Sequence, residues 1–147
     1  MNINAIIVTP LPRIQAIGGD VLKVLKCDES SFASFGEAYF SLVDNLAIKA
    51  WKRHNQMTLN LVVPIGKVRF VFADTNSYGE FTENFKIIEI GLENYSRITV
   101  PPGIWFGFQG LMPSPNLILN IGNLPHDPSE VDLKNLEEVP FNWGKFI

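Results

Sequence analysis

The chain has 147 residues, of which 46% are hydrophobic and 18% charged, and its formal net charge is −3 at pH 7. This length suits one domain with a core of its own, and the composition excludes a disordered chain. The acidic balance excludes a general electrostatic attraction to nucleic acid or anionic lipid, and the single cysteine, Cys27, excludes a disulfide-stapled secreted scaffold.

The first residues have no basic region and only a short apolar run, so they do not resemble a signal peptide. No later segment is apolar for the roughly eighteen residues that a membrane span needs. We therefore expect a soluble cytoplasmic protein with neither a nucleic-acid partner nor a membrane partner.

The N-terminal part predicts short strands. Residues 4–8 form a strand that Pro10 and Pro12 end, since proline cannot donate to a β-ladder. A turn follows at Gly18 and Gly19. Residues 21–26 are too few for periodicity to separate a helical turn from a strand, and we favour a strand. Residues 27–33 form a polar loop.

The next strand, over residues 35–43, has a polar face. Alternation places Glu37, Tyr39 and Ser41 on one side of it, where a carboxylate and a phenol could line a pocket. Strands over residues 46–52, 57–63 and 67–74 follow, the last two joined at the turn of residues 64–66. In the strand over 67–74, a polar face with Arg69 alternates with an apolar face.

Four more strands, over residues 85–90, 97–100, 104–109 and 116–121, bring the total to about nine, at a spacing typical of an antiparallel sandwich or barrel. Residues 124–147 are acidic and rich in proline, with one helical turn predicted at residues 128–133. We interpret residues 1–147 as one domain, in which residues 1–34 form N-terminal strands and a loop, residues 35–123 a barrel, and residues 124–147 a tail that wraps it.

A basic cluster runs along the strand over residues 46–52 and past its end: Lys49, Lys52, Arg53 and His54. In a regular strand these side chains alternate between the two faces, and their cationic groups could hold a diphosphate. The alternatives are a solvated edge strand, where lysines prevent aggregation, and a structural role for His54.

Other candidate ligand contacts are aromatic or amide side chains. Trp51 and Trp105 either stack on a base or sugar or belong to the core. Asn60, Asn116 and Asn120 lie in otherwise apolar strands, so each either contacts a ligand or satisfies the backbone at a bulge. We expect no metal site, because a lysine ammonium at position 52 repels cations and Phe106 replaces a later histidine ligand.

Four segments together resemble the dTDP-4-dehydrorhamnose 3,5-epimerase family. They are IKAWKRH, MTLNLVVPIGKVRFVFAD, ENYSRITVPPGIWFGFQGL and EVPFNW, within residues 35–143. VPPGIWFGF, at residues 100–108, is similar to the family's I-P-P-G-F-A-H-G-F, and VRFVFAD, ending at Asp74, is a second match. The resemblance implies a cupin-type jelly roll, usually a homodimer, acting on a thymidine-diphosphate 4-keto sugar in bacterial surface-polysaccharide pathways. It implies no metal or redox cofactor.

The chain departs from this family at the positions that carry the chemistry. Residues 48–52 align without gaps to the family's L-R-G-L-H segment. In this alignment Lys49 replaces the arginine, and Lys52 replaces the histidine that is the family's general base. The family's tyrosine acid falls near Leu119, and the histidine of its P-P-G turn is Phe106. The aspartate that orients the base falls near Leu136, with Glu137 and Glu138 adjacent.

Three hypotheses follow. The first is an isomerase in which Lys52 or His54 is the base, since burial lowers a lysine pKa. Its substrate contacts would be Lys49, Arg53, Tyr39, Asn60, Arg69, Trp105 and Asn120. The second is a non-catalytic member that binds a sugar nucleotide or a pathway partner, and the third is a structural or interaction barrel. The resemblance favours the first two.

Overall fold

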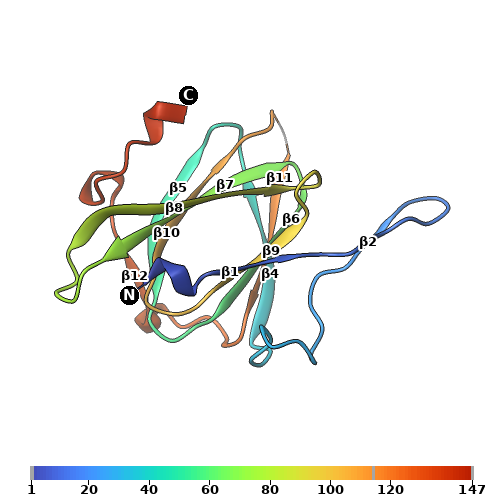
Figure 1. Ribbon diagram of the computed structural model, residues 1–147, viewed down its shortest axis with the longest axis horizontal. Helices are drawn as coiled ribbons and strands as arrows, with labels where there is room; N and C mark the ends of the chain where they lie inside the picture. Colours follow the sequence, from blue (N-terminus) through green and yellow to red (C-terminus); the bar gives the residue numbers. More distant parts are fainter. Residues whose placement is uncertain (1, 114, 147) are drawn as a thin grey trace.

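Two five-stranded antiparallel sheets pack face to face in the computed structural model, which describes residues 2–113 and 115–146 (Figure 1). The strand order is β1-β9-β6-β11-β4 in the first sheet and β12-β5-β10-β7-β8 in the second. The first sheet contains β1 (Ile7–Pro10), β9 (Ser96–Val100), β6 (Leu59–Ile65), β11 (Asn116–Gly122) and β4 (Glu37–Val43). The second contains β12 (Val131–Leu133), β5 (Ile48–His54), β10 (Trp105–Gly110), β7 (Lys67–Thr75) and β8 (Phe81–Gly91).

This arrangement confirms the prediction of an all-β jelly roll of the cupin type. The predicted strands from residue 35 onward lie within two residues of the observed ones at most ends, the main exception being β8, which begins four residues earlier. Short 3-10 turns replace longer helices: η1 (Ile3–Ala5), η2 (Pro128–Glu130), η3 (Leu136–Glu138) and η4 (Trp143–Phe146). Within the described residues, no helix has the length and apolar character needed to cross a membrane.

Three predictions at the ends of the chain were wrong in detail. Residues 4–8 divide between η1 and β1. Residues 21–26 contribute only β3 (Val21–Leu22), which pairs with β2 (Arg13–Ile14) as a small hairpin. The helical turn predicted at residues 128–133 ends at Glu130, because Val131 to Leu133 pair with β5 and continue the second sheet.

The predicted turn between β6 and β7 is confirmed, and it depends on Gly66. This residue has φ +81°, a conformation that glycine adopts without steric cost. A Cβ here would also lie 2.5 Å from the Pro115 carbonyl oxygen and the Asn116 side chain. The Asn116 side chain in turn accepts from the Lys67 N–H at 3.0 Å, so this asparagine satisfies backbone groups at the turn.

The inner faces of the sheets form the main hydrophobic core. Its largest members come from alternate positions of facing strands, as sandwich packing requires. They include Phe70, Phe72, Phe106, Leu59 and Ile98, each at most 1% exposed.

A second hydrophobic cluster lies on the outer face of the second sheet. Trp51, Val71, Ala73 and Trp105 pack there against Val139 and Trp143 of the C-terminal segment. In Figure 1 this segment, in red, runs along the side of the molecule where β5, β8 and β10 lie. The C-terminal segment therefore covers part of the outer face of this sheet with aromatic side chains.

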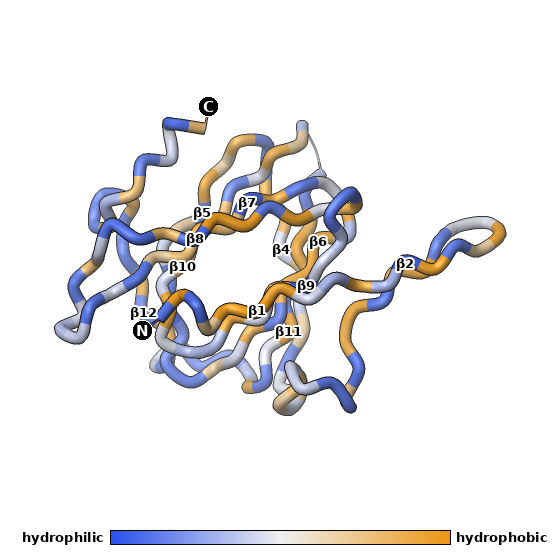
Figure 2. Tube along the Cα trace, in the orientation of Figure 1, coloured by the Kyte–Doolittle hydropathy of each residue, from blue (hydrophilic) through white to orange (hydrophobic). Residues whose placement is uncertain are grey.

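At its β4 edge, the outer face of the first sheet carries exposed apolar side chains. Phe40 and Leu42 of β4 are 64% and 65% exposed. The hairpin β2–β3 projects away from the body and carries hydrophobic residues toward its tip (Figure 2), where Ile17 is fully exposed.

Candidate functional site

A bulge in strand β5 determines which side chains face the interior. Phe106 of β10 pairs with Lys52, while Phe108, two residues on, pairs with Lys49, three residues back. Residues directly opposite in an antiparallel pair share a face, so both lysines lie on the inner face with the two phenylalanines. A regular strand would have put residues 49 and 52 on opposite faces.

Gly107 makes room for this bulge. A Cβ on Gly107 would lie 2.3 Å from the Cβ of Ala50 and 3.2 Å from the carbonyl oxygen of Lys49. Any larger residue would therefore push the two strands apart at the point where β5 carries its extra residue. Gly107, the second glycine of the VPPGIWFGF motif, therefore allows the close approach of β10 to the bulge in β5.

The two lysines line a cavity of about 480 Å³ at the edge where β4 and β5 face each other. Ser41 of β4 and Phe108 of β10 contribute to its walls, and the segment after β12 closes one side. The lining residues are Ser41, Lys49, Ala50, Trp51, Lys52, Phe108, Leu133, Lys134, Asn135 and Glu138.

Lys52 has an unusual environment for a lysine. Its Nζ lies 5.3 Å from the centroid of the Phe106 ring, and within the described part of the chain it has no carboxylate or hydrogen-bonding partner. Burial lowers the pKa of Lys52, and the positive charge of Lys49 lowers it further. Lys49 itself donates to the carbonyl oxygen of Leu42 at 2.8 Å.

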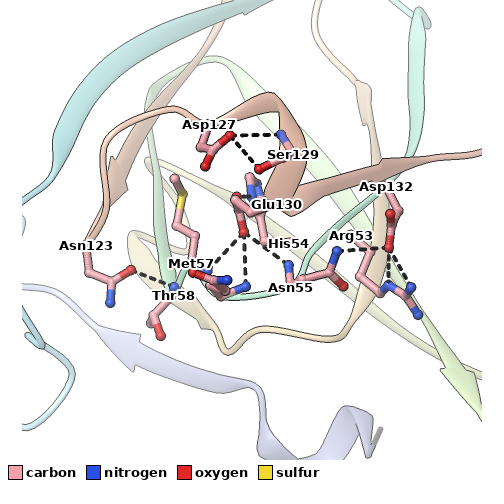
Figure 3. A network of polar contacts seen from close by, with 11 residues as sticks. Arg53, His54, Asn55, Met57, Thr58, Asn123, Asp127, Ser129, Glu130 and Asp132 are labelled. Carbon is pink, nitrogen blue, oxygen red and sulfur yellow. Dashed lines mark hydrogen bonds and ion pairs between the residues drawn. The ribbon is translucent and has the colours of Figure 1, made fainter.

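His54, two residues beyond Lys52, is held by a buried carboxylate (Figure 3). Its Nδ1 lies 2.5 Å from Oε1 of Glu130, and the two side chains are 7% and 5% exposed. The other carboxylate oxygen, Oε2, accepts from the backbone N–H groups of Asn55, Gln56 and Met57 at 3.0 to 3.2 Å.

These contacts determine the charge of Glu130. Burial alone would raise its pKa, but the hydrogen bonds from His54 and from the backbone of Gln56 and Met57 together lower it. The anionic Glu130 can accept a hydrogen bond from Nδ1–H of His54, so the carboxylate orients the imidazole ring through Nδ1 and leaves Nε2 as the ring nitrogen that does not contact it.

The second ring nitrogen, Nε2, differs from Nδ1 in its surroundings. Nε2 of His54 is buried and has no hydrogen-bond partner among the described residues. The ring stacks on Phe106, with the centroids 6.5 Å apart. Lys52 and His54 therefore both lie against the Phe106 ring of β10. Lys52 lines the cavity, whereas His54 is buried and is not one of the lining residues.

Two further predicted site residues lie on the inner face of the first sheet. Tyr39 pairs with Asn120 across β4 and β11, and Asn120 Nδ2 donates to Ser41 Oγ at 3.0 Å. Ser41 lines the cavity, whereas Tyr39 and Asn120 are not among its lining residues and lie beside Ser41 on the same face. Burial, and to a smaller extent Glu37, raises the pKa of Tyr39.

Arg53, Arg69 and Trp105 do not reach the cavity. They lie on the outer face of the second sheet, where Arg53 pairs with Asp132 and its guanidinium lies 4.9 Å from the Trp105 ring. Arg69 pairs with Glu89 at 2.8 Å, and its guanidinium lies 4.2 Å from the Phe146 ring.

Asn60 also lies away from the cavity, on the outer face of the first sheet. Its Nδ2 donates to the carbonyl oxygen of Ser31 at 3.2 Å, and its Oδ1 accepts from Thr99 Oγ1 at 2.6 Å. The amide therefore ties the loop before β4 to the sheet.

Sequence reasoning missed Glu130 as the partner of the histidine. The orienting carboxylate was expected near Leu136, but Glu138 instead accepts from the Asn135 N–H and pairs with Lys134. The segment Asp-Pro-Ser-Glu carries a signal for a short turn, because Asp127 caps it by accepting from the Ser129 N–H. Nothing local to that turn indicates that Glu130 points at a histidine 76 residues earlier.

The two positions where the resemblance leads us to expect the family's tyrosine and second histidine are apolar. Leu119 pairs with Phe40 on the outer face of the first sheet, and Phe106 belongs to the core. Across residues 2–113 and 115–146, no group of three or more histidine, cysteine or carboxylate side chains is placed to hold a metal ion.

Comparisons with known proteins agree with this fold. No model of a known protein family matches the sequence. A crystal structure of a dTDP sugar isomerase from Desulfovibrio desulfuricans G20 is 33% identical, with a TM-score of 0.88, and the match covers 95% of this chain and 90% of that one.

Two more distant relatives extend the comparison. The spore coat polysaccharide biosynthesis protein SpsL of Bacillus subtilis is 23% identical over 130 residues, 86% of each chain. The dTDP-4-dehydrorhamnose 3,5-epimerase of Bacillus anthracis, solved with TDP and PPi bound, is 14% identical with a TM-score of 0.80, and the match covers 98% of this chain and 87% of that one. The latter likeness concerns the fold alone.

Proposed function

Since the chain belongs to the dTDP-4-dehydrorhamnose 3,5-epimerase-like family of dTDP-sugar isomerases, we propose that it isomerises or epimerises a dTDP-linked 4-keto-6-deoxy sugar. This reaction would serve surface-polysaccharide biosynthesis in the cytoplasm, where nucleotide sugars are made. The observation that supports it best is the row of Lys49, Lys52 and His54 on the inner face of β5.

The order of these residues suggests how the substrate lies. Lys49 stands at the cavity mouth, where an ammonium group suits the diphosphate. Lys52 lines the same cavity and would face the sugar, and on the opposite sheet Ser41 offers a hydroxyl group that Asn120 holds by a hydrogen bond. The two unneutralised lysines give an otherwise acidic protein a local site for a dianion.

His54 supplies the base in this proposal. Removal of a proton beside the ketone needs an acceptor whose orientation is set. Glu130 holds the imidazole through Nδ1, while Nε2 has no hydrogen-bond partner in the part of the chain that the structure describes. Proton return to the same carbon from the other side gives an epimer, and return to the oxygen or a neighbouring carbon gives an isomer.

Hydrogen exchange tests this function directly. Incubation of the protein with dTDP-4-keto-6-deoxyglucose in deuterated water should place deuterium on a carbon beside the ketone, as seen by NMR. The His54→Gln variant should lose exchange and keep a thermal shift with dTDP, because the diphosphate contacts remain. Absence of exchange by the wild-type protein with such substrates would contradict the enzymatic proposal.

A non-catalytic sugar-nucleotide-binding protein is the second candidate. Its support is the apolar character of the positions at Leu119 and Phe106, where the family carries its acid and a second histidine. A stabilising thermal shift with dTDP together with no exchange of any 4-keto sugar nucleotide would favour this candidate.

We further propose a homodimer. The exposed side chains of Phe40 and Leu42 form an apolar strip on β4, and the hairpin β2–β3 presents Ile14 and Ile17 away from its own sheet. A second copy could cover both. Light scattering should give twice the chain mass, and the Phe40→Ser, Leu42→Ser double variant should be a monomer.

A further inference from the structure

We propose that Lys52 acts as a nucleophile and forms a covalent imine with the ketone carbon of the sugar. This inference rests on the proposed function, since it requires a keto-sugar substrate in the cavity. It assigns to Lys52 a task different from proton transfer or phosphate binding.

The position of the amine supports this assignment. Three other lysines are placed beside carboxylates: Lys67 beside Glu89, Lys134 beside Glu138 and Lys26 beside Asp28. Lys52 instead meets the face of Phe106 and shares the cavity with the cation of Lys49.

A desolvated lysine beside a second cation is the usual setting of a nucleophilic amine, because both factors favour the neutral form. Burial and Lys49 both lower the pKa of Lys52 in this way. Lys52 lines the cavity, whereas His54 lies behind the lining on the same face of β5, with its Nε2 buried. The two groups thus suit separate steps.

The chemistry balances without an oxidant or reductant. The Nζ lone pair attacks the ketone carbon, the C–O bond of the resulting carbinolamine breaks, and the oxygen leaves as water. The protonated imine withdraws electrons from the adjacent C–H bond, so that His54 Nε2 takes this proton and an enamine forms. Return of the proton to carbon and addition of water regenerate the ketone and the free amine.

This route accounts for a second feature of the site. An enolate intermediate needs a donor near the ketone oxygen, and the position expected for the family's tyrosine is Leu119, which faces away from the cavity. An enamine is neutral and needs no such donor.

Reductive trapping tests the inference. The full-length protein is incubated with dTDP-4-keto-6-deoxyglucose and cyanoborohydride, digested and analysed by mass spectrometry. We expect the peptide containing Lys52 to gain the mass of the sugar nucleotide less one oxygen atom. The Lys52→Arg variant, which keeps the charge, should lose the adduct. Lys67→Met, which removes a lysine outside the cavity, should form it as the wild type does.

Parallel measurement of deuterium exchange separates the two proposals. Exchange by the wild type without an adduct on Lys52, or an adduct on another lysine only, would overturn the imine and leave the proposed function intact. Exchange by Lys52→Arg at the wild-type rate would also overturn it. The absence of both exchange and adduct would contradict the proposed function, and with it the imine. Melting curves establish that each variant is folded.

Discussion

The two faces of strand β5 carry similar cationic side chains in opposite electrostatic situations. On the outer face, Arg53 is neutralised by Asp132 and lies against Trp105 beneath the C-terminal segment. On the inner face, Lys49 and Lys52 have no carboxylate partner in the described chain, and they border a cavity. Cations that are paired within the protein serve its stability, whereas unpaired cations in a cavity are available to an anionic or electrophilic ligand.

The largest effect is expected from removing Glu130, the carboxylate that links His54 on the inner face of β5 to the segment before β12. Glu130→Ala leaves Nδ1 of His54 and the backbone N–H groups of Gln56 and Met57 without their acceptor in a buried place, while the Asn55 N–H keeps the backbone carbonyl oxygen of residue 130. We expect it to lower the free energy of unfolding by about 3 to 5 kcal/mol in urea titrations, the range for breaking a buried pair.

The milder Glu130→Gln variant serves as the control. Its amide oxygen can accept one of these hydrogen bonds but carries no charge, so it should lose less stability while still losing deuterium exchange. Equal stability of Glu130→Ala and the wild type would contradict the structural importance of this carboxylate.

A substitution on the outer face of the second sheet should change the stability of the protein but not its binding of dTDP. Trp143 is 6% exposed and packs on Trp51 with the ring centroids 5.5 Å apart. Trp143→Ala should cost about 3 kcal/mol of unfolding free energy, because it opens a cavity in the outer cluster.

Binding provides the check on that variant. Below its melting temperature, Trp143→Ala should still give a thermal shift with dTDP comparable to that of the wild type. A loss of dTDP binding in a folded Trp143→Ala protein would mean that the outer cluster also shapes the cavity.

The pH dependence of the unfolding free energy tests whether Glu130 is anionic in the folded protein. Its folded-state pKa lies below the ordinary value of 4.5, so its contribution to stability is present above that pH and is lost as the pH falls through the folded pKa. One such group changes the unfolding free energy by at most about 1.4 kcal/mol per pH unit.

Comparison with Glu130→Gln isolates this carboxylate. Urea titrations between pH 6 and pH 3 should show a shallower acid loss for Glu130→Gln than for the wild type. Glu29 and Asp132, whose pKa values are also lowered, titrate in both proteins and cancel in the difference. Identical slopes would contradict an anionic Glu130 at neutral pH.

The smallest effects concern single cations on the two faces. Arg53→Met removes a partly exposed ion pair and should cost about 0.5 kcal/mol of stability, with the dTDP thermal shift unchanged. Lys49→Met should leave stability within the same margin but reduce the dTDP shift, since it removes a diphosphate contact. Isothermal titration with dTDP would verify the difference, and equal affinities of the two variants would contradict it.

Local patterns were enough to predict most of the framework. Alternation in β7 correctly separated its apolar inner face from Arg69, and the turn at Gly66 follows from a conformation that glycine favours. The order of strands, together with the VPPGIWFGF motif, indicated both the jelly roll and the family. These features depend on neighbours in the chain, so a sequence expresses them directly.

The composition of the site was decided only by the tertiary structure. The bulge opposite Gly107 turned Lys49 and Lys52 to the same face, and the pairing of β12 with β5 brought Glu130 to His54 from 76 residues away. The same packing placed Arg69 and Trp105 beneath the tail. Strand register and charge pairing are set by contacts between segments distant in the chain, which no local pattern encodes.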